Sequence, residues 1–250
     1  MRLRLVEMGE GPPLVLLHGL FGAARNWGGI QKQLARRFRV LAPDLRNHGE
    51  SPHAPGMSYA AMAEDLAETL HAHGAAGATV LGHSMGGKAA MALALRHPEM
   101  VGRLVVADIA PRRYAPSLRG YVAGMRAMAL TPGLARRDAD AALAASVPEP
   151  GIRAFLLQSL DFDSDPPRWR IGLEHISAGM AEVEDFPATG RYEGPVLVIA
   201  GERSDYIQPE DRALFLRLFP QARFAVVEKA GHWVHSENPR GFLAVLEDWL

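Results

Sequence analysis

The chain has no cysteine among its 250 residues, which excludes disulfide bonds, thiolate metal sites and a cysteine nucleophile. It also lacks an excess of charge of either sign. The formal net charge is −1 at pH 7, so no electrostatic argument favours nucleic acid or an anionic membrane as a partner. Metal-binding spacings such as His-Glu-x-x-His are missing too. We therefore expect no metal, no cofactor and no nucleic-acid partner.

Long hydrophobic runs are equally scarce, and no uninterrupted apolar stretch approaches the length of a transmembrane helix. Residues 1–7 (Met-Arg-Leu-Arg-Leu-Val-Glu) carry charges throughout and predict a first strand, not a signal peptide. The absence of cysteine fits a reducing compartment. These features predict a soluble cytoplasmic protein with no membrane partner, and they set no oligomeric state.

Short apolar runs alternate with longer amphipathic runs along most of the chain. The short runs lack strict alternation of polar and apolar residues, which is typical of strands buried on both faces. Strands that alternate with helices predict an α/β fold with a mostly parallel sheet covered on both sides. The expected strands are 14–17, 39–42, 78–81, 104–107, 196–200 and 223–227, and the expected helices are 30–37, 58–73, the run after residue 84, 212–219 and 239–250.

One pentapeptide points to a nucleophile. Residues 82–86 read Gly-His-Ser-Met-Gly, between the apolar run 78–81 and the helix-forming run 88–95. A strand, a sharp turn and a helix are the context of a G-x-S-x-G nucleophile elbow, in which glycines leave room for a strained serine. Ser84 is therefore the candidate nucleophile. The alternative is an ordinary turn in which the serine caps the helix.

The regular alternation fails once, from about 112 to 189, where no clear strand is found. This segment has helical stretches separated by prolines, so we expect a helical insertion in a core made of 1–111 and 190–250. An insertion at the carboxyl end of a strand overhangs the edge where ligands bind in open α/β folds. It is thus a candidate cap over Ser84, with a helical surface decoration as the alternative.

A serine hydroxyl needs a base in contact with it. His232 follows the run 223–227 in a loop of small residues before the last helix, which places it on the same rim as Ser84. The order serine, acid, histidine also matches this arrangement. His232 is the candidate base, and His235 is the alternative.

A carboxylate must orient the imidazole and stabilise its charged form. Asp108 closes one core strand and Asp205 follows a later one, so from position alone either could reach His232. Acyl transfer also needs N–H donors for the developing oxyanion. The candidates are the N–H groups of Met85 and of Leu20, with Phe21 as the alternative to Leu20.

Several motifs, in this order and spacing, resemble the α/β-hydrolase fold family over nearly the whole chain. They are His-Gly-Leu-Phe-Gly at 18–22, Asp-Leu-Arg-Asn-His-Gly-Glu-Ser at 44–51, Gly-His-Ser-Met-Gly-Gly-Lys at 82–88, Asp-Ile-Ala-Pro at 108–111 and Gly-His at 231–232. More narrowly, they are similar to the bacterial YbfF-type esterases and their mitochondrial ABHD-type relatives. The resemblance implies a carboxylesterase with a small helical cap.

The resemblance also bears on the acid. Many α/β-hydrolases carry it as Gly-x-x-Asp after the later strand, whereas Gly201 is followed here by Ser204 at that position and by Asp205 one residue late. In the YbfF-type group a serine occupies this position and the aspartate after the preceding strand is used. The resemblance therefore favours Asp108, with Ser204 as an auxiliary hydrogen-bonding partner.

These residues predict a serine hydrolase that cleaves carboxylic esters with short to medium acyl chains. Its expected partner is a small-molecule ester, and the expected substrate contacts are His83, Phe21, Tyr206, Phe155 and Trp169. The same machinery would serve a thioesterase, an amidase, a perhydrolase or a carbon–carbon bond hydrolase. A non-catalytic protein that binds a small ligand is the alternative from another class.

Overall fold

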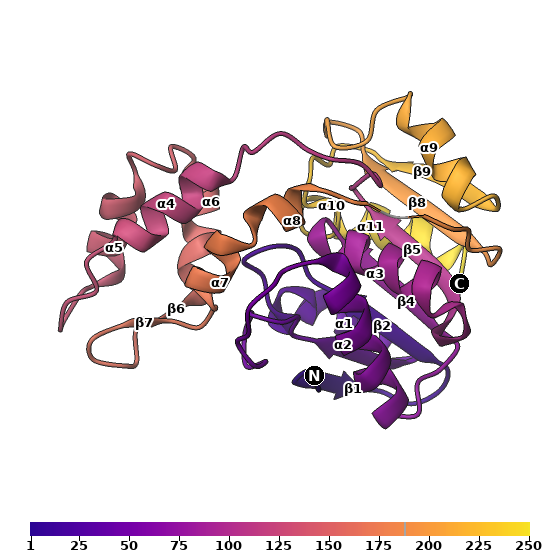
Figure 1. The fold of residues 1–250 in the computed structure, drawn as a ribbon, viewed down its shortest axis with the longest axis horizontal. Coiled ribbons are helices and arrows are strands. Elements are labelled where there is room, and N and C mark those ends of the chain that lie inside the picture. The colour runs from indigo at the N-terminus through magenta and orange to yellow at the C-terminus, as the bar shows by residue number, and fades with distance from the viewer. Residues whose placement is uncertain (188) are drawn as a thin grey trace.

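A computed structural model describes residues 1–187 and 189–250, and its centre is a seven-stranded sheet (Figure 1). Only the edge strand β1 runs antiparallel to its neighbour, and every other pairing is parallel. The predicted mostly parallel sheet is therefore confirmed. In spatial order the strands are β1 (Leu5–Met8), β3 (Arg39–Pro43), β2 (Pro13–Leu17), β4 (Ala78–His83), β5 (Val101–Ala107), β8 (Val196–Gly201) and β9 (Ala222–Val227).

Both faces of the sheet are buried, because helices cover each of them. In β2, Leu14 and Leu16 pack into one apolar cluster, and Val15 and Leu17 pack into another on the opposite face. This is why the strand has no polar residue in its alternation. The first cluster includes side chains of α1 (Gly28–Leu34), α10 (Val234–Glu237) and α11 (Pro239–Glu247), and the second includes those of α2 (Tyr59–Ala72), α3 (Met85–Arg96) and α9 (Asp211–Leu218).

The helices begin where local chemistry allows. The Ser58 hydroxyl accepts a hydrogen bond from the Ala61 N–H at 3.2 Å, so it caps the start of α2. Asn238 caps α11 in the same way, through the Gly241 N–H at 3.0 Å. These caps satisfy backbone N–H groups that the first helical turn leaves without a partner.

The segment between β5 and β8 forms a separate group of short elements beside the sheet (Figure 1). Most of its elements are short helices. A small hairpin was not expected there. In order, the elements are α4 (Arg119–Ala127), α5 (Arg136–Leu143), α6 (Pro150–Leu156), the 3-10 turn η3 (Leu157–Ser159), β6 (Leu160–Asp161), β7 (Arg168–Trp169), α7 (Leu173–Ala178) and α8 (Met180–Glu184).

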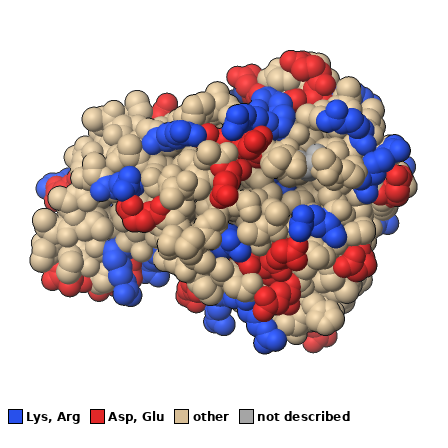
Figure 2. Space-filling model, in the orientation of Figure 1, with Lys and Arg blue, Asp and Glu red and all other residues tan. Residues whose placement is uncertain are grey.

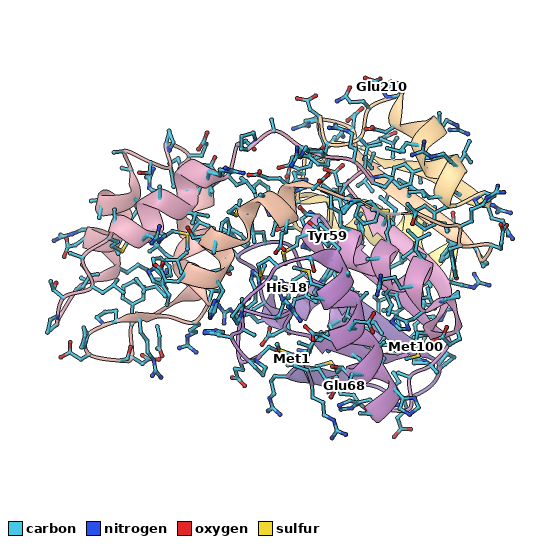
Figure 3. The ribbon with its side chains drawn as sticks, in the orientation of Figure 1. Met1, His18, Tyr59, Glu68, Met100 and Glu210 are labelled. Carbon is cyan, nitrogen blue, oxygen red and sulfur yellow. The ribbon has the colours of Figure 1, made fainter. Side chains whose placement is uncertain are left out.

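The inserted segment has its own apolar interior, which continues into the core. Met125, Leu143, Leu156 and Ile176 are fully buried and belong to the same cluster as the core residues of α2 and α3. The segment returns to the core through α8, close to Tyr59, which Figure 3 labels. The Tyr59 hydroxyl donates to the Val183 carbonyl of α8 at 2.7 Å. The insertion is thus packed against the core and does not hang free.

Acidic and basic side chains are interspersed over the face shown in Figure 2, as the small net charge suggests. Among the described residues, none of the helices combines the length and the apolar character needed to cross a bilayer.

Candidate active site

Ser84 lies in a sharp turn between β4 and α3. Its φ of +53° and ψ of −122° are a strained conformation for a residue with a side chain. A Cβ on Gly82 would lie 2.1 Å from the Gly86 carbonyl oxygen, and a Cβ on Gly86 would lie 2.5 Å from that of His18. Both glycines are therefore required by the close approach of backbone, and the turn presents Ser84 directly before the amino end of α3.

A continuous chain of hydrogen bonds joins Ser84 to two residues from distant parts of the sequence. Ser84 Oγ lies 3.0 Å from His232 Nε2, and His232 Nδ1 lies 2.8 Å from Asp108 Oδ2. Because a carboxylate only accepts, Nδ1 carries the proton. Nε2 then has a free lone pair that accepts the Ser84 hydroxyl, as a general base must.

The structure brings Asp108, and not Asp205, into contact with His232. Asp108 directly follows β5 and is fully buried. Its carboxylate also accepts from the Gly201 N–H at 2.9 Å and from the Ser204 hydroxyl. Asp205 is exposed, and within the described residues its carboxylate makes no hydrogen bond to the imidazole. Ser204 thus lies where the family resemblance implies.

Two aromatic rings hold His232 in place. The Tyr206 ring stacks on the His232 ring, with centroids 3.7 Å apart and planes at 16°. His83 Nε2 donates to the backbone carbonyl of His232 at 2.8 Å. Tyr206 and His83 are expected from the sequence to contact the substrate, and in the structure both support His232.

His235, the alternative base, lies behind these residues. Its ring meets the His83 ring edge to face at 4.7 Å, and no hydrogen bond to Ser84 is present among the described side chains. Burial lowers the pKa of His235 to about 4. The arrangement therefore favours His232 over His235 as the group that accepts the Ser84 proton.

The loop after β2 is fixed by two buried histidines. His18 Nε2 accepts from the Leu45 N–H at 2.9 Å, and His48 Nε2 accepts from the Phe21 N–H at 3.1 Å. Burial lowers the pKa of His18 to about 4 and that of His48 to about 3. Both imidazoles are therefore neutral near pH 7, which acceptance of an N–H bond requires.

This loop decides which N–H groups are free to bind an oxyanion. The Phe21 N–H is engaged by His48, and the Phe21 carbonyl accepts from the Ser159 hydroxyl at 2.8 Å. Within the described part of the chain, the N–H groups of Leu20 and Met85 have no hydrogen-bond acceptor. The geometry thus favours the pair Leu20 and Met85 over the alternative with Phe21.

The loop after β3 supports the same region. Asp44 accepts from the Ala24 N–H at 2.7 Å and from the Glu50 N–H at 2.9 Å. A Cβ on Gly49 would lie 2.1 Å from the Asp44 carboxylate, so this position needs glycine. In the sequence, the motif at 44–51 indicated only a resemblance to a family. The pattern did not predict that His48 or Asp44 helps to hold the site.

Two cavities flank Ser84. We call them the His232 cavity, of about 300 Å³, and the Lys88 cavity, of about 230 Å³. Phe155, which the sequence predicts as a substrate contact, lines the His232 cavity. Trp169 lines neither cavity, because it sits in β7, opposite Leu160 of the small hairpin. The expectation that Trp169 touches the substrate gains no support.

No group of three or more histidine, aspartate or glutamate side chains placed to hold a metal ion is found in residues 1–187 and 189–250. The imidazoles of His18, His83 and His232 near Ser84 are instead used in hydrogen bonds to side chains and to the backbone.

Comparison with known proteins agrees with this geometry. Residues 12–150 match the family described as alpha/beta hydrolase fold. The chain belongs to the α/β-hydrolase fold family. The chain is 41% identical over 248 residues to sn-1-specific diacylglycerol lipase ABHD11 of Mus musculus, with 96% of this chain and 81% of that protein covered. It is 36% identical to esterase YbfF of Escherichia coli (strain K12), with 95% and 92% covered.

A solved structure named as a marine microorganism esterase superposes on this α/β-hydrolase with a TM-score of 0.95. It is 34% identical and is covered over 99% of its length, against 100% of this chain. The predicted resemblance to YbfF-type and ABHD-type proteins is therefore confirmed. So is the predicted class of enzyme, a carboxylesterase-type hydrolase.

Proposed function

We propose that this α/β-hydrolase cleaves carboxylic esters by a serine mechanism in which Ser84 is the nucleophile, His232 the base and Asp108 the acid. The observation that carries the proposal is the unbroken chain of hydrogen bonds from Ser84 through His232 to Asp108, at 3.0 and 2.8 Å. The free N–H groups of Leu20 and Met85 beside Ser84 support it.

In the first half of the reaction, Ser84 Oγ forms a bond to the ester carbonyl carbon while its proton passes to His232 Nε2. The carbonyl oxygen becomes an anion, which the N–H groups of Leu20 and Met85 stabilise. The C–O bond to the alcohol then breaks, and the departing oxygen takes the proton from Nε2. An acyl-enzyme and a free alcohol result.

In the second half, water takes the place of the alcohol. His232 accepts one proton of the water as its oxygen attacks the acyl carbon, and the proton is returned to Ser84 Oγ when the acid leaves. Asp108 stays ionised and holds the Nδ1 proton, which keeps Nε2 pointed at Ser84 and stabilises the imidazolium. Ser204 and the Gly201 N–H fix the carboxylate in turn.

We further propose that residues 112–189 act as a cap over a core made of 1–111 and 190–250, and that the substrates have short to medium acyl chains. The position of Phe155 and Leu118 in the wall of the His232 cavity supports the cap. The small cavity volumes, of about 300 and 230 Å³, support substrates whose acyl and alcohol groups are short to medium in length.

The test is ester turnover by Ser84→Ala. Loss of the covalent step should lower kcat/KM by at least about three orders of magnitude with the fold intact. Ser236→Ala is the matched control, because Ser236 is exposed on α10. The esters tested should include a diacylglycerol, since the mouse relative is named as a diacylglycerol lipase. Near-normal turnover by Ser84→Ala would contradict a serine mechanism.

A further inference from the structure

The two cavities share one wall and differ in the rest. Ser84 and Leu20 line both, together with Tyr206 and the start of the inserted segment at Ser117 and Leu118. An ester likewise has one reacting carbon and two arms, the acyl chain and the alcohol. A nucleophile at the junction of two cavities suits a substrate whose reacting carbon lies at Ser84 and whose arms diverge.

We propose that the cavities sort the two arms of the ester, with the alcohol in the His232 cavity and the acyl chain in the Lys88 cavity. The inference rests on the proposed function and adds the orientation and class of its substrate. Phe155, which the sequence predicts as a substrate contact, contacts the alcohol in this orientation.

The path of the proton from His232 Nε2 to the departing alcohol indicates which cavity holds the alcohol. The departing alcohol oxygen must take a proton from His232 Nε2, so it must lie within hydrogen-bonding distance of that atom. His232 lines only the His232 cavity. The acyl chain receives no proton from the imidazole during cleavage and needs no contact with it. Met85, whose N–H is one of the two proposed donors to the carbonyl oxygen, lines only the Lys88 cavity of the two.

The walls of the His232 cavity indicate the kind of alcohol. Phe155 and Trp233 meet edge to face, with centroids 6.1 Å apart at 61°. Tyr121 and Trp27 also line this space. Aromatic walls of this kind favour flat, apolar groups, because ring–ring contacts add to the burial of area. We therefore infer that the alcohol arm is apolar and that an aromatic alcohol is accepted.

The charges around the Lys88 cavity indicate the kind of acyl chain. Lys88 Nζ donates to the carbonyls of Glu184 and Asp185, both at 3.1 Å, at the carboxyl end of α8. Arg112 pairs with Asp211 at 2.9 Å. Burial lowers the pKa of Lys88 to about 7, which weakens it further as a cation near neutral pH.

The remaining charge at this cavity is negative. The exposed carboxylate of Asp205 lines the Lys88 cavity, and it has no ion pair among the described residues. An acyl chain that ends in a carboxylate would therefore meet no free cation of the described structure and one free anion. The chemistry favours uncharged acyl chains, and monoesters of dicarboxylic acids should be poor substrates.

The first experiment uses the unmodified enzyme and two isomeric esters. Benzyl acetate carries its ring on the alcohol, and methyl phenylacetate carries the same ring on the acyl chain. We expect kcat/KM to be about tenfold higher for benzyl acetate, in line with the worth of a matched apolar contact. A second pair of esters tests the effect of a charge on the acyl chain. The kcat/KM for methyl butyrate should exceed that for monomethyl succinate by a similar factor. Equal values, or the reverse order, in either pair would overturn the corresponding assignment.

The second experiment narrows one cavity at a time. Ala115→Leu narrows the Lys88 cavity at an exposed position, and Ile152→Phe narrows the His232 cavity on α6. Each is measured on a series of acyl lengths with one alcohol and on a series of alcohols with one acyl chain. Ala115→Leu should steepen only the acyl profile, and Ile152→Phe only the alcohol profile. The opposite assignment, or equal change in both profiles, would contradict the sorting of arms.

Titration of each variant with a fluorophosphonate distinguishes failure of the cavity assignment from failure of the proposed function. A variant that is fully labelled but has an altered profile of ester preference reports on the cavities alone. Failure of the unmodified enzyme to be labelled or to turn over any ester would instead contradict the proposed function itself.

Discussion

The core and the inserted segment hold their polar groups in different ways. In the core, Asp108 is fully buried and bonded to His232, Ser204 and the Gly201 N–H. In the inserted segment, Arg126 and Glu174 pair at 2.7 Å with side chains that are 47% and 72% exposed. Buried, fully bonded groups are fixed in place and lie in a low dielectric, where electrostatic interactions are strong.

An exposed ion pair such as Arg126 and Glu174 adds little to the free energy of unfolding, because water screens the attraction between the two charges. The groups that are held most rigidly thus lie at the strand ends of the core, where the proposed mechanism moves protons. In its proposed role as a cap, the inserted segment needs only to keep its shape beside the cavities. Changes that disturb fixed core groups should therefore have the largest effects, and changes in the pairs of the insertion the smallest.

The largest difference is expected between two aspartates. Asp108→Asn should lower kcat/KM by about four orders of magnitude, the effect of the same change in the serine-protease precedent, because an amide cannot hold the imidazole in the required tautomer. Asp205→Asn should stay within a few-fold of the parent on uncharged esters. A crippling loss in Asp205→Asn, measured on the same ester, would mean that the acid is misassigned.

The next effect is on stability and comes from buried histidines. Burial lowers the pKa of His48 from 6.5 to about 3 in the folded state. The unfolded chain therefore binds its proton first as the pH falls. The contribution of His48 to the free energy of unfolding is therefore fully present above about pH 6.5. It is lost progressively as the pH falls from there to the folded-state pKa.

For His48 alone this loss is roughly 3 kcal/mol between pH 7.5 and pH 4.5, because each unit of pKa shift corresponds to about 1.4 kcal/mol. Urea unfolding at the two pH values measures it, and His48→Gln should show a smaller difference than the parent. The control is His175→Gln in the inserted segment, which should leave the difference unchanged. Equal differences in all three proteins would show that His48 is not a source of the acid sensitivity.

A smaller effect separates two aromatic residues of the inserted segment. Phe155→Ala widens the His232 cavity and should change the preference among alcohols by about tenfold, within the range expected for apolar complementarity. Trp169→Ala should leave the preference as it is, because Trp169 lines neither cavity. A shifted profile in Trp169→Ala would show that the insertion reaches the substrate in another arrangement.

The smallest effect is expected for the exposed ion pair. Arg126→Ala should lower the free energy of unfolding by less than about 1 kcal/mol, the usual range for such pairs. Denaturant unfolding at low and high salt checks this, and any loss should shrink with salt. A loss of several kcal/mol would mean that the insertion depends on its charges as closely as the core does.

Much of the core could be predicted from the sequence because its strands are buried on both faces. The runs at 14–17, 78–81 and 196–200 read as strands for this reason and lie in β2, β4 and β8. The serine turn was predictable as well, since only glycine fits at residues 82 and 86. His232 was predicted from its place in the loop after the run 223–227 and from chain order, because parallel strands end on the same edge of the sheet.

The rest depended on contacts that no local pattern encodes. The hairpin of β6 and β7 has two residues in each strand, too few to show any period. His48 binds the Phe21 N–H across 27 positions of the chain, and only tertiary packing brings them together. Trp169 is large and aromatic in the right segment, but composition does not say which face of an insertion meets the substrate.

The central claim is that Ser84 attacks the substrate with help from His232. The most direct test is to treat the purified protein with a fluorophosphonate probe and locate the adduct by mass spectrometry of its peptides. We predict one adduct, on Ser84, that is slowed by a competing ester and is lost in both Ser84→Ala and His232→Ala. An adduct on another residue, or none while esters are still cleaved, would contradict the account.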